Sequence, residues 1–426
     1  MIIVMTVLLF VFLALGIPVA VAVGVPSLLY VFANPGFMNF VAIQRMVAGV
    51  NTYSLLAVPF FILAANLMNT GGVTTRIFDA CRITMGRVKG GLAYVNIIAS
   101  VIFAGMSGAA IADAGGLGAI EIKSMRESNY DDRLTIGITA SSSLIGPIIP
   151  PSMPMVVYGV VASTSIGRLF AAGLLPGLLM ALSLVGMILL LLDRWNCPRG
   201  KKTTLMEKLR ANKRAFLSLL TPVIILGGIF TGYFTPTEAA AIACLYATLL
   251  GIFYKDLTLK SFMKSVRESL ITSVQVLIIV AAAALFSNIL AREQIPQKLM
   301  MVVQQSNMAP WMIILLINVM LLIVGLFMET IASINLLVPV LLPIVVTLGI
   351  DPVQFGIIII LNLVIGTLTP PFGTVLFVLS GVADVSVEKV ARSVMIFLPP
   401  LLVVLALVNI FPQISLWLPN LLFGVA

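Results

Sequence analysis

Long apolar runs separated by short polar segments follow one another along almost the whole chain. An α-helix needs roughly 20 apolar residues to cross a bilayer, and the longest runs have about that length. They lie at 169 to 192, 216 to 233, 237 to 254 and 394 to 418. A chain of 426 residues has room for roughly ten to twelve crossing or re-entrant segments and little else. The pattern predicts an all-α polytopic membrane protein.

One strongly polar stretch, 193 to 214, divides the chain into halves of similar size. It holds eight of the 25 basic residues, so the positive-inside rule predicts a cytoplasmic linker. A shift of 220 residues pairs Gly105 with Gly325, Gly146 with Gly366, and Pro150-Pro151 with Pro370-Pro371. A shift of 222 extends the match upstream, for example from Asn66 to Asn288. We therefore expect two pseudo-symmetric repeats, 1 to 192 and 215 to 426, as in many secondary transporters.

The same order of segments recurs in each half. An amphipathic stretch comes first, at 38 to 50 and 258 to 270, and is expected to form an arm helix in the membrane interface. A spanning run follows it, at 54 to 68 and 271 to 290. The third segment contains a Gly-rich or polar break, which predicts a re-entrant hairpin. The fourth segment is interrupted by prolines, which predicts a broken helix. The expected hairpins are at about 92 to 122 and 310 to 346, and the broken helices at 132 to 162 and 352 to 383.

The break in the first hairpin reads FAGMSGAAIADAGG, residues 103 to 116. Backbone without helical hydrogen bonds is tolerated at bilayer depth only if it is buried in protein or lines a water-filled cavity. Its carbonyls, the Ser107 hydroxyl and the Asp113 carboxylate are then candidate ligands for a small cation. The matching break, GLFMETIASIN, offers oxygen ligands at Glu329, Thr330, Ser333 and Asn335.

Prolines interrupt the broken helices, in LIGPIIPPSMP at 144 to 154 and VIGTLTPPFGT at 364 to 374. A proline lacks the donor for the carbonyl four residues earlier, which is therefore expected to be free. The proline and glycine pairs are Pro150 with Gly146 and Pro370 with Gly366. Free carbonyls suit Na⁺, and hydroxyl groups lie close by at Ser141, Ser142, Ser143, Thr367 and Thr369. Two symmetric copies predict at least two cation sites that flank one substrate site.

These features also have purely structural interpretations. A Gly/Pro kink can serve packing alone, and Asp113 can cap a helix near the mouth of the hairpin. For Glu238, which follows a Thr-Pro-Thr sequence, a capping box is the favoured interpretation. Arg45 and Arg267, which the repeat pairs, are interpreted as interfacial side chains, with a role in attracting substrate as the alternative. The charged segment 121 to 133 is interpreted as a solvated loop.

The composition excludes several other classes of protein. Hydrophobic residues make up 60% of the chain and charged residues 10%, whereas a soluble domain has roughly 25% charged residues. Histidine is absent and the three cysteines are far apart, so we expect neither a transition-metal site nor a disulfide framework. The excess of basic residues fits cytoplasmic loops and not nucleic-acid binding. The apolar N-terminus has no basic region before it and is expected to remain as a membrane helix.

Several motifs resemble the large membrane subunit of tripartite ATP-independent periplasmic (TRAP) transporters. They are GMSGAAIADAGGLGAIEI at 105 to 122, IGPIIPPSMP at 145 to 154, GYFTPTEAAAIA at 232 to 243 and the run from Phe327 to Phe377. The likeness covers essentially the whole chain and is greatest to the sialic acid branch with separately encoded subunits. The sequence departs from the family at Gln354, where many relatives carry His. It also has no four-helix region of the kind that some relatives carry fused.

The resemblance implies a Na⁺-driven elevator of the ion-transporter superfamily in the bacterial inner membrane. Its substrate would be an organic acid, with sialic acid favoured and a C4-dicarboxylate next. The implied partners are a separate small four-helix membrane subunit, a soluble periplasmic binding protein and the lipid bilayer, with no nucleic acid. The resemblance implies no enzyme activity, no catalytic residue and no cofactor, with Na⁺ as the coupling ion.

The sodium sites of the family, carried over residue by residue, imply two sets of ligands in this chain. The first set is Ser107, Asp113, Ser141, Gly146 and Pro150. The second set is Glu329, Thr330, Ser333, Gly366, Thr367 and Thr369. Several of these residues would bind through backbone carbonyls. Substrate contacts are expected from the same hairpin tips, with Ser143 and Asn335 as candidates.

Three other functions are compatible with parts of the pattern. A self-sufficient Na⁺/carboxylate symporter of the same superfamily would need no binding protein. An integral membrane enzyme is disfavoured because the chain has no His, no HExxH motif and no catalytic Ser/Lys or Asp/Asp spacing in its apolar runs. A passive channel would not need broken helices in both halves, although channels do contain them.

Overall fold

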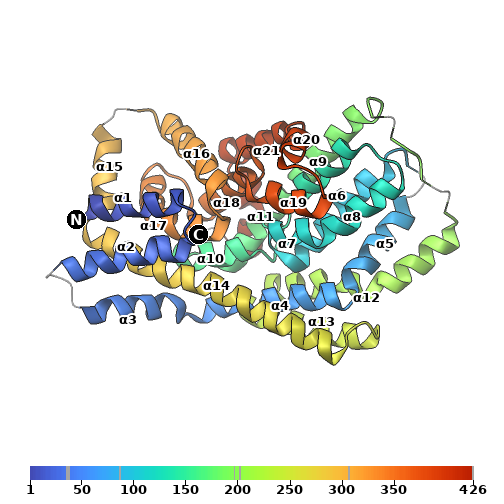
Figure 1. The fold of residues 1–426 in the computed structure, drawn as a ribbon, viewed down its shortest axis with the longest axis horizontal. Helices are drawn as coiled ribbons and strands as arrows, with labels where there is room; N and C mark the ends of the chain where they lie inside the picture. The colour runs from blue at the N-terminus through green and yellow to red at the C-terminus, as the bar shows by residue number, and fades with distance from the viewer. Residues whose placement is uncertain (35–38, 86–87, 196, 201–202, 306–307, 425–426) are drawn as a thin grey trace.

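The computed structural model describes residues 1 to 34, 39 to 85, 88 to 195, 197 to 200, 203 to 305 and 308 to 424. These residues are mostly helical, and the only strand-like contact among them is an isolated bridge between Lys89 and Arg199. The helices form an elongated body (Figure 1). The all-α fold class expected from the sequence is confirmed.

The helices divide at the basic linker, of which residues 196, 201 and 202 lie outside the described part. Those before it are α1 (Ile2–Ala14), α2 (Val19–Ala33), α3 (Asn39–Val50), the 3-10 turn η1 (Tyr53–Leu56), α4 (Ala57–Thr70), α5 (Val73–Met85), α6 (Gly91–Ser107), α7 (Ala110–Gly115), α8 (Leu117–Glu127), α9 (Asp132–Ser143), α10 (Met153–Val161) and α11 (Ile166–Leu191). Those from the linker onward are α12 (Leu205–Phe230), α13 (Pro236–Phe253), α14 (Leu259–Arg292), α15 (Ile295–Gln305), α16 (Pro310–Phe327), α17 (Thr330–Thr347), α18 (Pro352–Leu368), α19 (Thr374–Ala383), α20 (Val387–Val394), α21 (Leu398–Ile410) and α22 (Gln413–Phe423).

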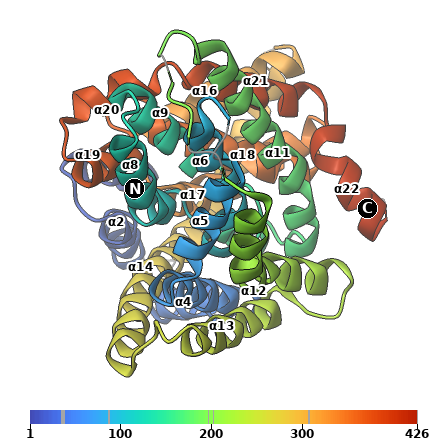
Figure 2. The same cartoon turned by 90° about the vertical axis from the view of Figure 1, so that its right-hand side faces the viewer.

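By length and composition, seven of the described helices can cross a membrane, or eight spans if the bent pair α20 and α21 counts as one. The helices α6, α18 and α19 are apolar but shorter. Short apolar helices that end inside a protein body are typical of transporters with interrupted segments. Figure 2 shows α4, α13 and α14 together along one edge of the body.

The two arm segments differ in structure. In the first half, α3 ends at Val50 and a 3-10 turn separates it from α4; residue 38 of the expected arm lies outside the described residues. In the second half, α14 is one continuous helix of 34 residues, so the stretch 258 to 270 is its first part and not a separate element. Thr258 caps its start by accepting a hydrogen bond from the backbone N–H of Ser261 (3.2 Å). No glycine or proline interrupts this helix, which explains its continuity.

The apolar run 394 to 418 is not one spanning helix, as its pattern suggested. It is divided among the end of α20, the whole of α21 and the start of α22, and α20 and α21 are bent by 55°. Pro399 and Pro400 lie in the first turn of α21, and Pro412 directly precedes α22. Proline is tolerated at the first turn of a helix but disrupts its interior, so these prolines mark helix starts inside an apolar run.

The segment 121 to 133 is not a solvated loop, and this expectation was wrong. Its first part belongs to α8, which ends at Glu127. The side chains of Glu121, Ile122 and Met125 are buried, whereas Lys123 is exposed, so α8 is an amphipathic helix with one face in the protein core. The high density of charges in the sequence concealed this helical periodicity.

Equivalent aspartates start the first half of each broken helix. Asp131 accepts a hydrogen bond from the backbone N–H of Arg133 (2.8 Å), and Asp351 accepts one from that of Val353 (2.7 Å). The helices α9 and α18 that follow are interrupted at 144 to 152 and at 369 to 373. In both breaks the peptide bond between the two prolines is cis.

The capping box expected at Glu238 is confirmed at the start of α13. Glu238 accepts a hydrogen bond from the backbone N–H of Thr235 (2.8 Å) and donates its own N–H to Thr235 Oγ1 (3.3 Å).

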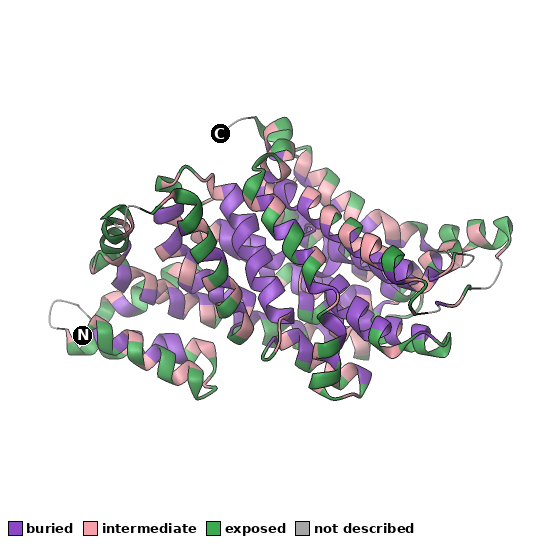
Figure 3. Cartoon of the chain, turned by 90° about the horizontal axis from the view of Figure 1, so that it is seen from above, coloured by how far each residue is buried: buried purple, intermediate pink, exposed green. Residues whose placement is uncertain are grey.

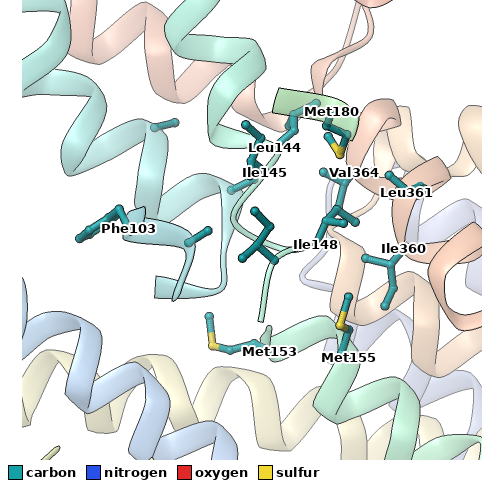
Figure 4. Close-up of a cluster of buried hydrophobic side chains, with 14 of the residues drawn as sticks. Phe103, Leu144, Ile145, Ile148, Met153, Met155, Met180, Ile360, Leu361 and Val364 are labelled. Carbon is teal, nitrogen blue, oxygen red and sulfur yellow. The ribbon is translucent and has the colours of Figure 1, made fainter. Parts of the chain in front are cut away.

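The hydrophobic core surrounds the first break. Buried residues concentrate in the middle of the body and exposed residues towards its ends (Figure 3). Ile145 and Ile148 of the break lie in one cluster with Met155 of α10 and with Ile360 and Val364 of α18 (Figure 4). Because these side chains come from both halves of the chain, the two broken helices share one core.

Candidate functional site

The turns of both hairpins and the breaks of both broken helices meet around one small internal cavity of about 50 Å³. Its lining residues come from all four segments: Ala109, Ala110 and Ile111; Pro147 and Pro154; Glu329, Thr330 and Ile331; and Thr367. These segments are far apart in the sequence and belong to both repeats. The structure therefore brings the four interrupted segments to one place.

Asp113 is the buried acidic side chain next to the first half of this site. Its side chain, on α7, is 2% exposed and accepts a hydrogen bond from the Ser107 hydroxyl through Oδ1. Its other oxygen, Oδ2, is buried and has no hydrogen-bond partner among the described residues. A methyl group on Gly146 would overlap this oxygen, so the first break passes directly beside the carboxylate. Three of the five residues proposed for the first sodium site, Ser107, Asp113 and Gly146, are therefore adjacent.

Gly108 lets the first hairpin turn pack onto the first break. Its φ is +65°, a conformation that glycine adopts without strain. A methyl group at Gly108 would lie 2.6 Å from the carbonyl oxygen of Pro151 and 3.1 Å from the nitrogen of Met153. The carbonyl of Gly108 in turn accepts a hydrogen bond from that nitrogen (3.4 Å). The hairpin turn and the break are thus in backbone contact.

In the second half, Glu329 caps α17. Its carboxylate accepts a hydrogen bond from the backbone N–H of Ala332 (3.3 Å), and the Ser333 hydroxyl donates to the Glu329 carbonyl (3.1 Å). Glu329 therefore caps this helix, and together with Thr330 it also lines the central cavity. Thr367 lines the same cavity, and its hydroxyl donates to the carbonyl of Val364 (2.7 Å).

The two broken helices differ in the carbonyls that their prolines were expected to free. Among the described residues, no backbone hydrogen bond reaches the carbonyl of Gly146, as expected from Pro150. The carbonyl of Gly366, however, accepts a hydrogen bond from the N–H of Thr369 (3.0 Å), so the expectation for Pro370 was wrong. The last turn of α18 tightens from four residues to three, which satisfies the carbonyl that the proline cannot reach. Its second lone pair remains open for an ion.

Most of the hydroxyl groups near both breaks donate their protons within their own helices, whereas Ser142 also donates to Asn96 of α6 (2.6 Å). Ser141 donates to Gly137 O (2.8 Å), Ser143 to Ala140 O (2.8 Å) and Thr369 to Ile365 O (2.8 Å). A hydroxyl that donates its proton to the backbone still has lone pairs for a cation. Ser143 does not line the central cavity, nor the larger cavity between α3, α10, α14 and α17.

A larger cavity of about 440 Å³ lies between α3, α10, α14 and α17. Arg45 of α3 and Asn335 of α17 line it, together with other polar side chains at Thr52, Ser287 and Asn288. Much of the remaining lining is small and apolar, including Ala48, Gly49, Ala283 and Ala284. Asn335 is the one of the two substrate candidates that reaches this cavity. Because Asn335 follows the second hairpin turn by only a few residues, the larger cavity adjoins the central site.

Glu121 is a buried carboxylate that the sequence interpretation missed. Its side chain, on α8, is 1% exposed, and Oε1 has no hydrogen-bond partner among the described residues. It follows Asp113 by eight residues and lies on α8, the returning helix of the same hairpin. The helical periodicity of α8 was the signal that could have revealed its burial. Buried carboxylates without partners are costly and usually functional in membrane proteins.

Two asparagines that the repeat pairs, Asn96 and Asn318, join each hairpin to its neighbouring broken helix. Asn96 of α6 accepts a hydrogen bond from the Ser142 hydroxyl of α9 (2.6 Å) and donates to Thr139 Oγ1 (2.7 Å). Asn318 of α16 accepts a hydrogen bond from Asn362 Nδ2 of α18 (2.7 Å). The sequence carried this signal, since the shift of 222 residues relates the two asparagines. Each pair holds a hairpin and a broken helix together as one unit.

Replacing Asn318 with leucine is expected to lower the free energy of unfolding by about 1–2 kcal/mol. The change removes one of the two acceptors of the fully buried Asn362 amide, which keeps only the Ile358 carbonyl (2.8 Å). It also removes the hydrogen bond from Asn318 to Asn409 Oδ1 (2.9 Å). Thermal unfolding of the purified protein in detergent measures the effect. Asn212→Leu, at an exposed position of α12, is the matched control and should change the melting temperature little. An equal effect of both variants would contradict a structural role for the buried asparagines.

Comparison with known families identifies the chain. A family model described as "Tripartite ATP-independent periplasmic transporter, DctM component" matches residues 6–414. The chain belongs to this family. It is accordingly a multi-pass membrane permease and not an enzyme, and the resemblance stated from its motifs is confirmed.

Curated relatives of this DctM-family chain are transporter permeases. It is 47% identical to the sialic acid TRAP transporter large permease protein SiaM of Vibrio cholerae over 96% of both chains. It is 42% identical to the sialic acid TRAP transporter permease protein SiaT of Haemophilus influenzae, over 96% of this chain and 66% of the relative. It is 41% identical to the C4-dicarboxylate TRAP transporter large permease protein DctM of Pseudomonas aeruginosa, over 86% of both.

A solved structure supports the fold independently of sequence. The Alcanivorax borkumensis YdaH transporter, whose crystal structure is described as having an unusual topology, matches with a TM-score of 0.68. The match covers 91% of this chain and 90% of the other at 12% sequence identity. The shared arrangement of helices thus extends beyond the family to a transporter of very different sequence.

Proposed function

We propose that this chain is the large membrane subunit of a Na⁺-coupled uptake system for an organic acid, with sialic acid as the first substrate to test and a C4-dicarboxylate as the second. A small four-helix membrane subunit completes the membrane part, and a soluble periplasmic binding protein delivers the substrate. The corresponding location is the bacterial inner membrane. The printed names of the relatives at 47%, 42% and 41% identity support this choice of substrates.

The observation that carries the proposal of Na⁺ coupling is the open carboxylate oxygen of Asp113. A buried carboxylate without a counter-charge is costly, and a bound cation removes that cost. Around it lie the Ser107 hydroxyl and the backbone of Gly146, which are oxygen ligands of the kind that hard cations prefer. The described residues contain no group of three or more His, Cys, Asp and Glu side chains that could hold a metal ion, so a weakly held monovalent ion fits this site better than a divalent one.

The proposed elevator motion has a physical basis in the boundary between the central helices and α12. The moving part consists of the two hairpins and the two broken helices, which share one core and two asparagine contacts. At its boundary, a methyl group on Gly105 of α6 would lie 2.6 Å from Pro222 Cβ of α12. Small residues at such a boundary let helix backbones approach closely without interlocking side chains. A close contact of this kind is compatible with sliding at this point of the boundary.

The larger cavity suits the proposed organic acid. A guanidinium group binds a carboxylate through two parallel hydrogen bonds, and Arg45 is the only charged residue in the lining. The amides of Asn288 and Asn335 and the hydroxyls of Thr52 and Ser287 can bind the hydroxyl groups of a sugar acid. We therefore assign Arg45 to substrate binding, which was the alternative to an interfacial role.

Uptake in proteoliposomes tests the proposed function. The vesicles contain this chain with its small subunit under an inward Na⁺ gradient, with radiolabelled sialic acid outside and with or without the purified binding protein. We expect accumulation above equilibrium only when both the Na⁺ gradient and the binding protein are present. An inward K⁺ gradient of equal size is the control.

Three outcomes would each reject a part of this proposal. Uptake without the binding protein would favour a self-sufficient Na⁺/carboxylate symporter. Equilibration without accumulation would indicate a passive channel. If sialic acid fails and a C4-dicarboxylate is accumulated under the same conditions, the choice of substrate changes and the transport mechanism stands.

A further inference from the structure

A third cavity, here called the basic cavity, lies away from the central site. It is at the end of the body where α5 and α12 lie together (Figure 1). Its volume is about 1070 Å³. Among the described residues, it shares no lining residue with the central cavity or with the larger cavity that contains Arg45. Its charged lining residues are five bases, Arg76, Arg82, Arg210, Lys213 and Arg214, and three acids, Asp79, Glu207 and Asp256. Neither the coupling ion nor the substrate of the proposed function uses this cavity.

All three carboxylates of the basic cavity already have partners. Asp256 pairs with Arg76 (2.6 Å), and Asp79 pairs with Arg82 (3.0 Å). Glu207 accepts a hydrogen bond from the backbone N–H of Thr204 (2.7 Å) at the start of α12. The two paired arginines and the capping glutamate thus form a polar wall, and the remaining three bases are left for a ligand.

Arg210, Lys213 and Arg214 are these remaining bases. Their spacing of three and four residues puts them on one face of α12, where like charges repel each other. All three are exposed, and none takes part in an ion pair with another described residue. A helix face that presents three bases without an ion pair beside a large cavity is suited to an anion.

The same helix provides an apolar surface beside one of the bases, Lys213. At 26 residues α12 is about 39 Å long, which exceeds the roughly 30 Å of bilayer hydrocarbon. Its basic first turns therefore extend to the lipid headgroups. Further along the helix, Phe216 and Val223 are 57% and 62% exposed and lie seven residues apart on the face that also carries Lys213 and Leu209. Positive charge at headgroup level above an apolar stripe matches the two ends of a phospholipid.

We propose that this cavity binds the phosphate headgroup of an anionic phospholipid, with its acyl chains against Phe216 and Val223. The two arginines and the lysine contact the phosphate, for which guanidinium groups provide paired hydrogen bonds. Arg76 is held in place by Asp256 and stacks on the Tyr254 ring, 3.9 Å from its centre, so it contributes charge from a fixed position. The basic linker 193 to 214, whose second part forms the first turns of α12, assigns this headgroup to the cytoplasmic leaflet.

Lipid titration followed by native mass spectrometry tests the proposal. The chain is purified with its small subunit, freed of lipid and titrated with phosphatidylglycerol or with phosphatidylcholine of the same acyl chains. We expect selective binding of phosphatidylglycerol, which the combined variant Arg210→Gln, Lys213→Gln and Arg214→Gln weakens on the order of a hundredfold. The matched control removes the same charge from α14 with Lys260→Gln, Lys264→Gln and Arg267→Gln and should retain wild-type affinity. If the triple variant does not fold, Lys213→Gln alone should weaken binding about fivefold.

Several results would overturn the proposal. Equal affinity for the two lipids would remove the role of charge, and equal loss in both triple variants would remove the role of the cavity. Displacement of the lipid by millimolar inorganic phosphate would indicate a site for a free anion. Binding that appears only when the small subunit is absent would assign this surface to the interface between the subunits.

Discussion

Replacing Gly366 with alanine is expected to abolish Na⁺-driven uptake and to lower the free energy of unfolding by about 1–3 kcal/mol. A methyl group at Gly366 would lie 2.6 Å from the Cα of Gly325 and 2.9 Å from the carbonyl oxygen of Leu322. Both neighbours are backbone atoms, which cannot turn aside as a side chain can, so α16 and α18 must move apart. These two helices lead into the second hairpin turn and the second break, and their separation displaces the proposed ligands of the second cation site.

Uptake in proteoliposomes and thermal unfolding measure the two effects of Gly366→Ala. The matched control is Gly381→Ala in α19, where a methyl group has no neighbour within 4 Å. Alanine there should leave uptake intact and stabilise the helix by about 0.5–1 kcal/mol, because glycine is the poorer helix former. Wild-type uptake by Gly366→Ala would show that the close approach of α16 and α18 is not needed for transport.

The internal repeat made the candidate site predictable from the sequence. The paired glycines and prolines marked four breaks, and the structure has interrupted helices at these positions around one small cavity. The pairing of Gly325 with Gly105, and of Gly366 with Gly146, identified positions where a backbone, a proline ring or a carboxylate approaches too closely for a side chain to fit without displacement. A pattern that recurs in two halves carries information that a single glycine or proline does not.

Other features depended on contacts that a linear pattern does not contain. The burial of Glu121 follows from the packing of α8 against neighbouring helices, and its charged neighbours in the sequence suggested the opposite. The hydrogen bond from Thr369 to Gly366 is a local tightening that the rule for prolines does not include. The position of Arg45 on a cavity depends on α3 lying against α14, a contact between the two halves of the chain.

Replacing Asp113 with asparagine is expected to raise the melting temperature without Na⁺ and to reduce the stabilisation by Na⁺. Asparagine can still accept the hydrogen bond from Ser107. It replaces a buried carboxylate whose second oxygen has no partner among the described residues. Removing an uncompensated buried charge lowers a cost of several kcal/mol, so the ion-free variant becomes more stable. A site filled at 100 times its dissociation constant adds about 2.7 kcal/mol of stability, and the variant loses this contribution at the first site. Melting temperatures in NaCl and in KCl, with uptake measured in parallel, give both quantities.

The opposite signs of the two effects separate an ion site from a merely structural carboxylate. If Asp113 only supported the fold, its loss would lower stability in NaCl and KCl alike. Gly146→Ala keeps the charge but pushes the carboxylate away from the break, so it should reduce the Na⁺ response without stabilising the ion-free protein. Asp384→Asn is the matched control, because Asp384 is exposed and has a φ of 52°, which asparagine also adopts. An unchanged Na⁺ response in Asp113→Asn would exclude this carboxylate as a ligand and leave the second half of the site as the source of coupling.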